Sequence, residues 1–118
     1  MTLRIEGEET YIGKDLRVYH QGSLFTGEVI SRDAENKVIG LAHYVEGISC
    51  GPQVQWHSDG SRKSEGQSEM GVAVGEWRRW HANGQLAERY VFTPQGRWVR
   101  RQRWGKDGKC TVDRSYDA

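Results

Sequence analysis

The stretch Gly75-Glu76-Trp77-Arg78-Arg79-Trp80-His81-Ala82-Asn83-Gly84-Gln85-Leu86 decides the fold, because its centre recurs at a fixed interval. Trp56-His57-Ser58-Asp59-Gly60 stands 24 residues before residues 80–84, and Trp104-Gly105-Lys106-Asp107-Gly108 stands 24 residues after them. A constant interval is typical of an array of similar units. Tyr19-His20-Gln21-Gly22-Ser23-Leu24 resembles residues 80–86 with one residue deleted, so we interpret it as a degenerate, off-period first copy.

Each unit is predicted to form one β-hairpin. Short runs of β-forming residues alternate with turn signals about every twelve residues, and Asn-Gly and Asp-Gly pairs favour the positive φ that hairpin turns need. The expected strands are residues 16–20, 24–32, 37–46, 49–57, 61–68, 72–81, 85–92, 97–104 and 109–114. Helix is disfavoured, since glycine interrupts every candidate segment.

These hairpins predict an all-β fold, a single-domain antiparallel β-meander of about nine strands in an elongated, twisted sheet. We expect residues 1–15 to form an arm or N-terminal cap and residues 16–118 to form the hairpin repeat domain. A cap is expected because the first unit of a repeat array otherwise exposes an unpaired edge.

The repeated residues are predicted to be structural. One tryptophan per hairpin would lie in register on one face of the sheet, about 9.6 Å from the next, and would anchor the core. The predicted structural repeat core is Trp56, Trp80, Trp104, Gly60, Gly84, Gly108 and Leu86. Trp77 and Trp98 fall outside this series, so either could be a partly exposed binding aromatic.

Composition agrees with a thin sheet. Only 36% of the 118 residues are apolar and the mean hydropathy is −0.81, which is low for a domain with a thick two-layer interior. The net charge is +1, but residues 1–60 carry 5 basic and 9 acidic side chains while residues 61–118 carry 12 and 7. The molecule should therefore be dipolar along its length.

Two cysteines, Cys50 and Cys110, cannot build a dense disulfide framework, so a reduced, cytoplasmic setting is the expectation. The first residues contain no apolar run of the kind that a signal peptide needs, and no later segment approaches a membrane span.

The pattern Gly-x-Trp-x-x-Trp-His-x-Asn-Gly-x-Leu at residues 75–86 resembles the MORN-variant repeat (membrane occupation and recognition nexus) of bacterial YwqK-family antitoxins. Residues 51–60 match more loosely. Val18-Tyr19-His20-Gln21-Gly22-Ser23-Leu24-Phe25-Thr26-Gly27-Glu28-Val29 is also similar to the start of these proteins. The resemblance implies a meander of stacked hairpins and a role as antitoxin or immunity protein to a bacterial toxin. The last copy departs from it, with Gly105, Arg101 and Cys110 at the positions of His81, Trp77 and Leu86.

No pattern of residues predicts catalysis or a metal. His57 and His81 occupy equivalent positions, but one hairpin apart is about 9.6 Å between backbones, while a zinc ligand needs its nitrogen about 2.1 Å from the ion. The chain has no Gly-x-Ser-x-Gly elbow and no phosphate-binding glycine loop. We therefore expect no enzyme, no metal and no cofactor.

The candidate partner-binding residues combine the off-series aromatics, a basic group and two acids from the front half of the chain. They are Trp77, Arg78, Arg79, Trp98, Arg101, Arg103, Glu28 and Glu46. Basic residues interleaved with aromatics are also typical of nucleic-acid surfaces, and a solvated outer face would have the same composition. The acids could pair with a basic toxin and speed its association.

The leading hypothesis is a non-enzymatic antitoxin or immunity protein that occludes a cognate protein toxin. A general protein-interaction scaffold is one alternative. Binding of nucleic acid or anionic membrane through the C-terminal arginines is another, against which the near-zero net charge counts. No small-molecule substrate is expected, and the sequence leaves the oligomeric state open.

Overall fold

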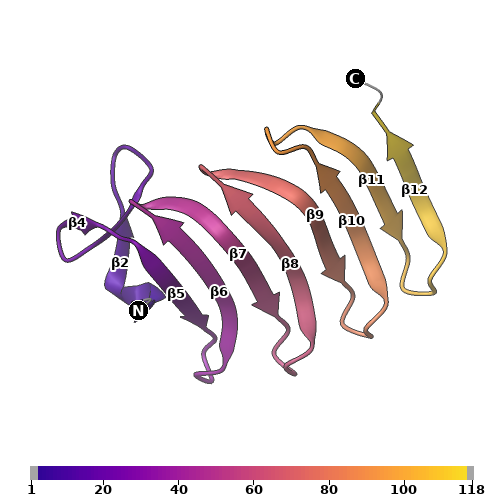
Figure 1. Ribbon diagram of the computed structural model, residues 1–118. Helices are drawn as coiled ribbons and strands as arrows, with labels where there is room; N and C mark the ends of the chain where they lie inside the picture. The colour runs from indigo at the N-terminus through magenta and orange to yellow at the C-terminus, as the bar shows by residue number, and fades with distance from the viewer. Residues whose placement is uncertain (1–2, 117–118) are drawn as a thin grey trace.

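The computed structural model describes residues 3–116, which form one nine-stranded sheet and one three-stranded sheet. The predicted all-β, elongated meander is confirmed: the long strands lie side by side in one curved sheet (Figure 1). Consecutive strands from β5 to β12 are antiparallel. In spatial order the strands are β1 Arg4–Glu6, β5 Gly27–Arg32, β6 Val38–Val45, β7 Ile48–Trp56, β8 Arg62–Glu69, β9 Val72–Trp80, β10 Leu86–Phe92, β11 Trp98–Trp104 and β12 Cys110–Ser115.

The front of the predicted meander is wrong in one respect. Residues 16–24 do not join the long sheet but contribute β3 (Val18–His20) and β4 (Ser23–Leu24) to the small sheet, together with β2 (Thr10–Ile12). The chain leaves this sheet at Phe25, which is buried, and re-enters the large one at Gly27. Gly27 has φ +145°, and a Cβ there would lie 2.3 Å from the Leu3 carbonyl oxygen, so only glycine fits this crossing.

Residues 4–9, part of the cap predicted for residues 1–15, lie along the β5 edge of the large sheet. Strand β1 pairs in parallel with β5, matching Ile5 with Val29, and the 3₁₀ turn η1 (Gly7–Glu9) follows it directly. Parallel pairing arises because the chain must travel through the small sheet before β5 returns beside β1. The edge of β5 is therefore paired by the short strand β1, whereas the longer strand β12 lies at the open edge at the other end of the sheet (Figure 1).

The turns at one end of the sheet repeat with the 24-residue period. In each, the first amide donates to the carbonyl four residues on: His57 to Ser61, His81 to Gln85, and Gly105 to Lys109. The same bond joins Asp33 to Lys37, so the on-period first copy is residues 32–37. In that copy Arg32 stands at the tryptophan position and Asn36, with φ +68°, stands at the glycine position.

The interpretation of residues 19–24 as the first copy is therefore wrong. Gln21 and Gly22, both with positive φ, form a tight two-residue turn between β3 and β4. That turn belongs with the turns at the opposite end of the large sheet, Glu46-Gly47 and Met70-Gly71, which also have two positive φ values each. The likeness in sequence arose because both turn types require a residue that accepts positive φ.

The repeated histidines connect one turn to the next. The ring Nε2 of His57 lies 3.2 Å from the Trp80 carbonyl oxygen, and that of His81 lies 2.8 Å from the Trp104 carbonyl oxygen. Since a carbonyl only accepts, each ring donates from Nε2. Gly105 holds the next equivalent position and has no ring to donate such a bond, and β12 is the last strand within residues 3–116.

The sequence predicted that the repeated tryptophans form the buried core, and this prediction is wrong about the location of the core. Trp56, Trp80 and Trp104 do occupy equivalent ladder positions, each at the end of a strand, but they are only half-buried. The buried cluster is at the N-terminal end, where the small sheet supplies a second layer; its members are Ile5, Phe25 and Val29, with Val18 and Tyr44 packed against them. A single sheet has no opposing layer to cover a tryptophan completely.

Candidate functional site

One face of the large sheet is open from β6 to β11, and the ladder register shows which residues share it. Directly opposed residues point to the same face. One row runs Gly40, Gln55, Ser64, Arg79, Glu88 and Arg103, a second runs Ala42, Gln53 and Gly66, and a third runs Trp77, Tyr90 and Arg101. We name this the hollow face, because it carries two hollows.

The first hollow has a volume of about 450 Å³ and a neutral lining. Its floor consists of small or amide-bearing residues from β5 to β8, which are Ser31, Gly40, Ala42, Gln53, Gln55, Ser64 and Ser68. Tyr44 and Trp77 also line it. Burial raises the pKa of the Tyr44 phenol, so that hydroxyl stays neutral. The hollow therefore offers hydrogen-bonding groups and aromatic surface without a formal charge.

Trp77 is fixed across strand β8. Its Nε1 donates to the Gln67 carbonyl oxygen at 2.9 Å, and a Cβ at Gly66 would lie only 2.0 Å from the indole. The ring thus covers the bare backbone of Gly66. An indole held this way is a preorganised contact surface, because little side-chain entropy remains to be lost when a partner binds.

The second hollow, of about 360 Å³, continues the hollow face toward β12 and is charged. Glu88 lies between two arginines one repeat apart: Arg79 Nη1 is 3.7 Å from its Oε2, and Arg103 Nε is 3.2 Å from its Oε1. Glu88 is 20% exposed whereas the arginines are 57% and 45% exposed, so the arginines face solvent. Two cations about one anion give this hollow a net positive charge.

The opposite face carries its own lattice of ion pairs. Glu76 contacts both Arg78 and Arg89, and Arg100 contacts Asp113 at 3.1 Å. The Arg100 guanidinium is also the main reason why the pKa of Asp113 is lowered. Five arginines of the predicted basic group thus contact three carboxylates of this chain, Glu76, Glu88 and Asp113, and only the Arg78–Glu76 pair lies within one strand.

The structure brings together only some of the predicted partner-binding residues. Trp77, Arg79, Arg101 and Arg103 share the hollow face, whereas Arg78 projects from the other side. Among the residues described, the buried Nε of Arg101 has no hydrogen-bond partner. From the sequence, only the alternation of side chains along a strand could indicate that Arg78 and Arg79 lie on opposite faces of the sheet.

Trp98 lies apart from the hollow face, at the corner next to the open edge. It is 41% exposed, and its ring centroid is 5.8 Å from that of Tyr116, which is 54% exposed. Trp, Tyr and Arg are the residues most enriched at binding hot spots, and Arg97 lines the same shallow hollow. This corner remains a second candidate contact.

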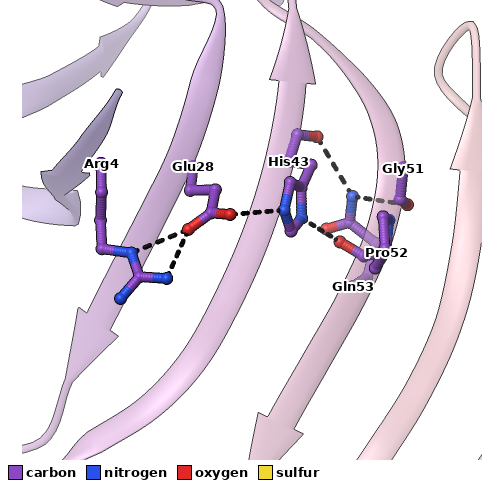
Figure 2. A network of polar contacts seen from close by, with 6 residues as sticks. All are labelled: Arg4, Glu28, His43, Gly51, Pro52 and Gln53. Atoms are coloured by element: carbon purple, nitrogen blue, oxygen red, sulfur yellow. Dashed lines mark hydrogen bonds and ion pairs between the residues drawn. The ribbon is translucent and has the colours of Figure 1, made fainter. Parts of the chain in front are cut away.

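The two predicted acidic contacts are not part of the hollow face. Glu46 occupies the two-residue turn between β6 and β7. Glu28 projects from the opposite face of β5, where Arg4 and His43 hold its carboxylate (Figure 2). The contact with Arg4 is the main cause of the lowered pKa of Glu28. Sequence reasoning missed His43 because it occupies a bulge in β6, outside the 24-residue pattern.

Sequence reasoning also missed Tyr44, Gln53, Gln55 and Ser64, the neutral lining of the first hollow. The available signal was the alternation along residues 49–57 and 61–68, which puts Gln53 and Gln55 on one face. This alternation did not mark them as candidate site residues, because they are neither charged nor repeated at the 24-residue interval.

Within residues 3–116, no group of three or more His, Cys, Asp and Glu side chains is placed to hold a metal ion. Cys50 and Cys110 are both free thiols. The described part of the chain also has no helix long and apolar enough to cross a membrane.

No family model and no curated protein matches this chain. The likeness to the MORN-variant repeat therefore stays an expectation that rests on the motifs of residues 18–29 and 75–86.

Proposed function

We propose that this chain is a non-enzymatic antitoxin or immunity protein, which binds a cognate protein toxin through the hollow face and occludes it. The observation that carries the proposal is the composition of that face: a neutral hollow beside Trp77, continuous with the Arg79, Glu88 and Arg103 row. Such a surface combines aromatic anchors with fixed polar groups, as protein-binding sites do. The toxin class itself comes from the family resemblance.

The geometry supports occlusion because the hollow face is held before binding. Its strands are cross-linked by the main-chain ladder, and the side chains at its centre already make contacts within the chain. A preorganised surface loses less conformational entropy on association than a flexible one.

The pairing of the arginines favours a protein partner over nucleic acid or anionic membrane. Release of counterions from a polyanion needs several unpaired cations, whereas Arg78, Arg79, Arg89, Arg100 and Arg103 share three carboxylates of the same chain and keep a net charge of only 5 − 3 = +2. The other alternative, a general protein-interaction scaffold, would also bind its partner through the hollow face. A cytoplasmic setting remains our prediction.

Co-expression with the protein encoded next to this chain tests the proposal. We expect that protein to arrest growth when it is expressed alone, and we expect co-expression to restore growth and yield a stoichiometric complex. A neighbouring product that is harmless, or one whose toxicity this chain does not relieve, would contradict the antitoxin proposal. Capture of a harmless neighbour in the complex would favour the scaffold alternative.

A further inference from the structure

A chain of polar contacts crosses the first four strands of the large sheet, from β1 to β7 (Figure 2). Arg4 donates from Nε to Glu28 Oε2 at 2.8 Å. The other carboxylate oxygen of Glu28 lies 3.0 Å from His43 Nε2, and His43 Nδ1 lies 2.7 Å from the Pro52 carbonyl oxygen. The imidazole of His43, on β6, thus links β5, the strand next to β1, with β7.

Both ring nitrogens of His43 face atoms that can only accept. A carbonyl oxygen has no proton to give, and a carboxylate whose pKa is lowered, as that of Glu28 is by Arg4 first and His43 second, is ionised. A neutral imidazole donates from one nitrogen only. The ring therefore satisfies both contacts only as the doubly protonated imidazolium.

The surroundings hold the ring in this position. The charged groups that face it are the Glu28 carboxylate on β5 and, behind that, the Arg4 guanidinium on β1; from β7 come the neutral Pro52 carbonyl and the Gln53 amide. Gly51 lies under the ring, since a Cβ there would be 3.1 Å from the His43 Cβ. The His43 side chain is 23% exposed and that of Glu28 is 16% exposed, so their contact is partly shielded from water, whereas Arg4 is 58% exposed.

The polar contacts act on β1 together with the ion pair between Glu6 Oε1 and Arg32 Nε at 2.6 Å. The ladder of β1 with β5 covers only three residue pairs, and η1 follows β1 immediately. Ile5 of β1 and its partner Val29 of β5 are both members of the buried cluster. Loss of β1 would expose that cluster and the unpaired edge of β5.

We propose that His43 is a proton-operated tie that fastens the N-terminal cap strand β1 to the repeat sheet. When the ring loses its second proton, one nitrogen presents a lone pair to an oxygen, and that contact opens. The charge that helps to orient Glu28 toward both Arg4 and His43 disappears at the same time. Histidine changes charge between about pH 5 and pH 8, so the tie is complete in mildly acidic solution and loosens as the pH rises.

Amide hydrogen exchange, corrected for intrinsic rates and recorded at about pH 5.5 and about pH 8, tests this proposal. In the wild-type protein we expect the protection of β1 and β5 amides to fall about tenfold or more over this range, which corresponds to one charge-assisted hydrogen bond. Amides of β11, at the far end of the sheet, should not change. His43→Gln should show the low protection at both pH values.

His57→Gln is the matched control. Its ring donates from Nε2 to a single carbonyl, which the neutral form also does, so the pH dependence at β1 should be that of the wild type. Glu28→Gln, which keeps an acceptor but removes the charge, should flatten the dependence even if His43→Gln fails to fold. Wild-type protection that does not change with pH, or an equal change in the Glu28→Gln variant, would overturn the proposal.

Discussion

At the residue scale, the position of the Trp77 side chain depends on Gly66, which lies outside the repeated motif of residues 75–86. The indole lies across Gly66, on the neighbouring strand, where any side chain would collide with it. The sequence pattern marked Trp77 as exceptional only because it fell outside the 24-residue series. Which backbone it covers depends on the bulge between Glu65 and Gln67, which a repeat pattern does not reveal.

Gly66→Ala should displace the indole and break its hydrogen bond to the Gln67 carbonyl. We expect the free energy of unfolding to fall by about 1–3 kcal/mol, as for other overpacked sites, with a red shift in tryptophan fluorescence. Urea unfolding measures the first and emission spectra the second. In a Trp77→Ala background the same glycine substitution should cost almost nothing, and an undiminished cost there would contradict the assigned contact.

Asp59 gives a pH prediction at the same scale. Its pKa is held below the ordinary 3.8, first by the Ser61 hydroxyl and then by the Ser61 amide, which both donate to the carboxylate. A lowered folded pKa means that the stabilisation is present above pH 3.8 and is lost as the pH falls through the lower value.

Asp59→Asn should keep the turn, because Asn83 already serves in the equivalent turn by accepting from the Gln85 amide at 3.0 Å. We therefore expect little change in the urea midpoint at neutral pH and a shallower loss of stability in acid. Midpoints measured over about pH 2 to 6 check this. The same slope in both proteins would show that Asp59 does not contribute to it.

At the element scale, the hairpins are joined through their turns as well as through their strands. The sequence correctly predicted the strands of residues 38–115 and the Asp-Gly and Asn-Gly turns, because turn chemistry and alternation are local properties. It did not predict the small sheet, whose existence depends on the long-range packing of Phe25 against Ile5. Nor did it assign a role to the repeated histidines, whose partners are 23 residues away.

His81→Ala should weaken the last hairpin, because it removes the hydrogen bond to the Trp104 carbonyl. We expect a loss of about 1 kcal/mol in the free energy of unfolding and faster amide exchange in β11 and β12 than in β6. Gly105→His is the informative partner variant: within residues 3–116 no hairpin lies beyond β12 to accept from the new ring, so the variant should not stabilise the protein. A clear stabilisation by Gly105→His would contradict the account of the histidine contacts.

At the scale of the whole molecule, the sheet is long, and most of it is a single layer. The Cα radius of gyration is 15.9 Å and the principal extents are 47 × 39 × 27 Å. A compact domain of this length would have a radius of gyration of about 13.5 Å. The low apolar content predicted this shape, because a single-layered sheet has few side-chain positions that are shielded from water and need an apolar residue.

Small-angle X-ray scattering should therefore give a radius of gyration above the compact value and a maximum dimension that reflects the long axis. Dilution should leave both unchanged if the open edge at β12 does not pair with a second copy. A radius of gyration near about 13.5 Å would match a compact domain of this length and would contradict the extended sheet.

The central claim is that the hollow face is the surface that meets the partner. Gln55 lines the neutral hollow and is exposed, while Gln67, also exposed, projects from the other face of the adjacent strand. Gln55→Arg places a bulky charge in the hollow, and Gln67→Arg makes the same change outside it. The two variants carry the same substitution on adjacent strands and on opposite faces of the sheet.

Calorimetric titration of the partner from the neighbouring gene with both variants is the most direct measurement. We predict that Gln55→Arg weakens binding at least about tenfold, because an unpaired charge buried at an interface is costly, while Gln67→Arg leaves the affinity within about twofold. Equal affinities for the two variants, or a greater loss with Gln67→Arg, would contradict the claim.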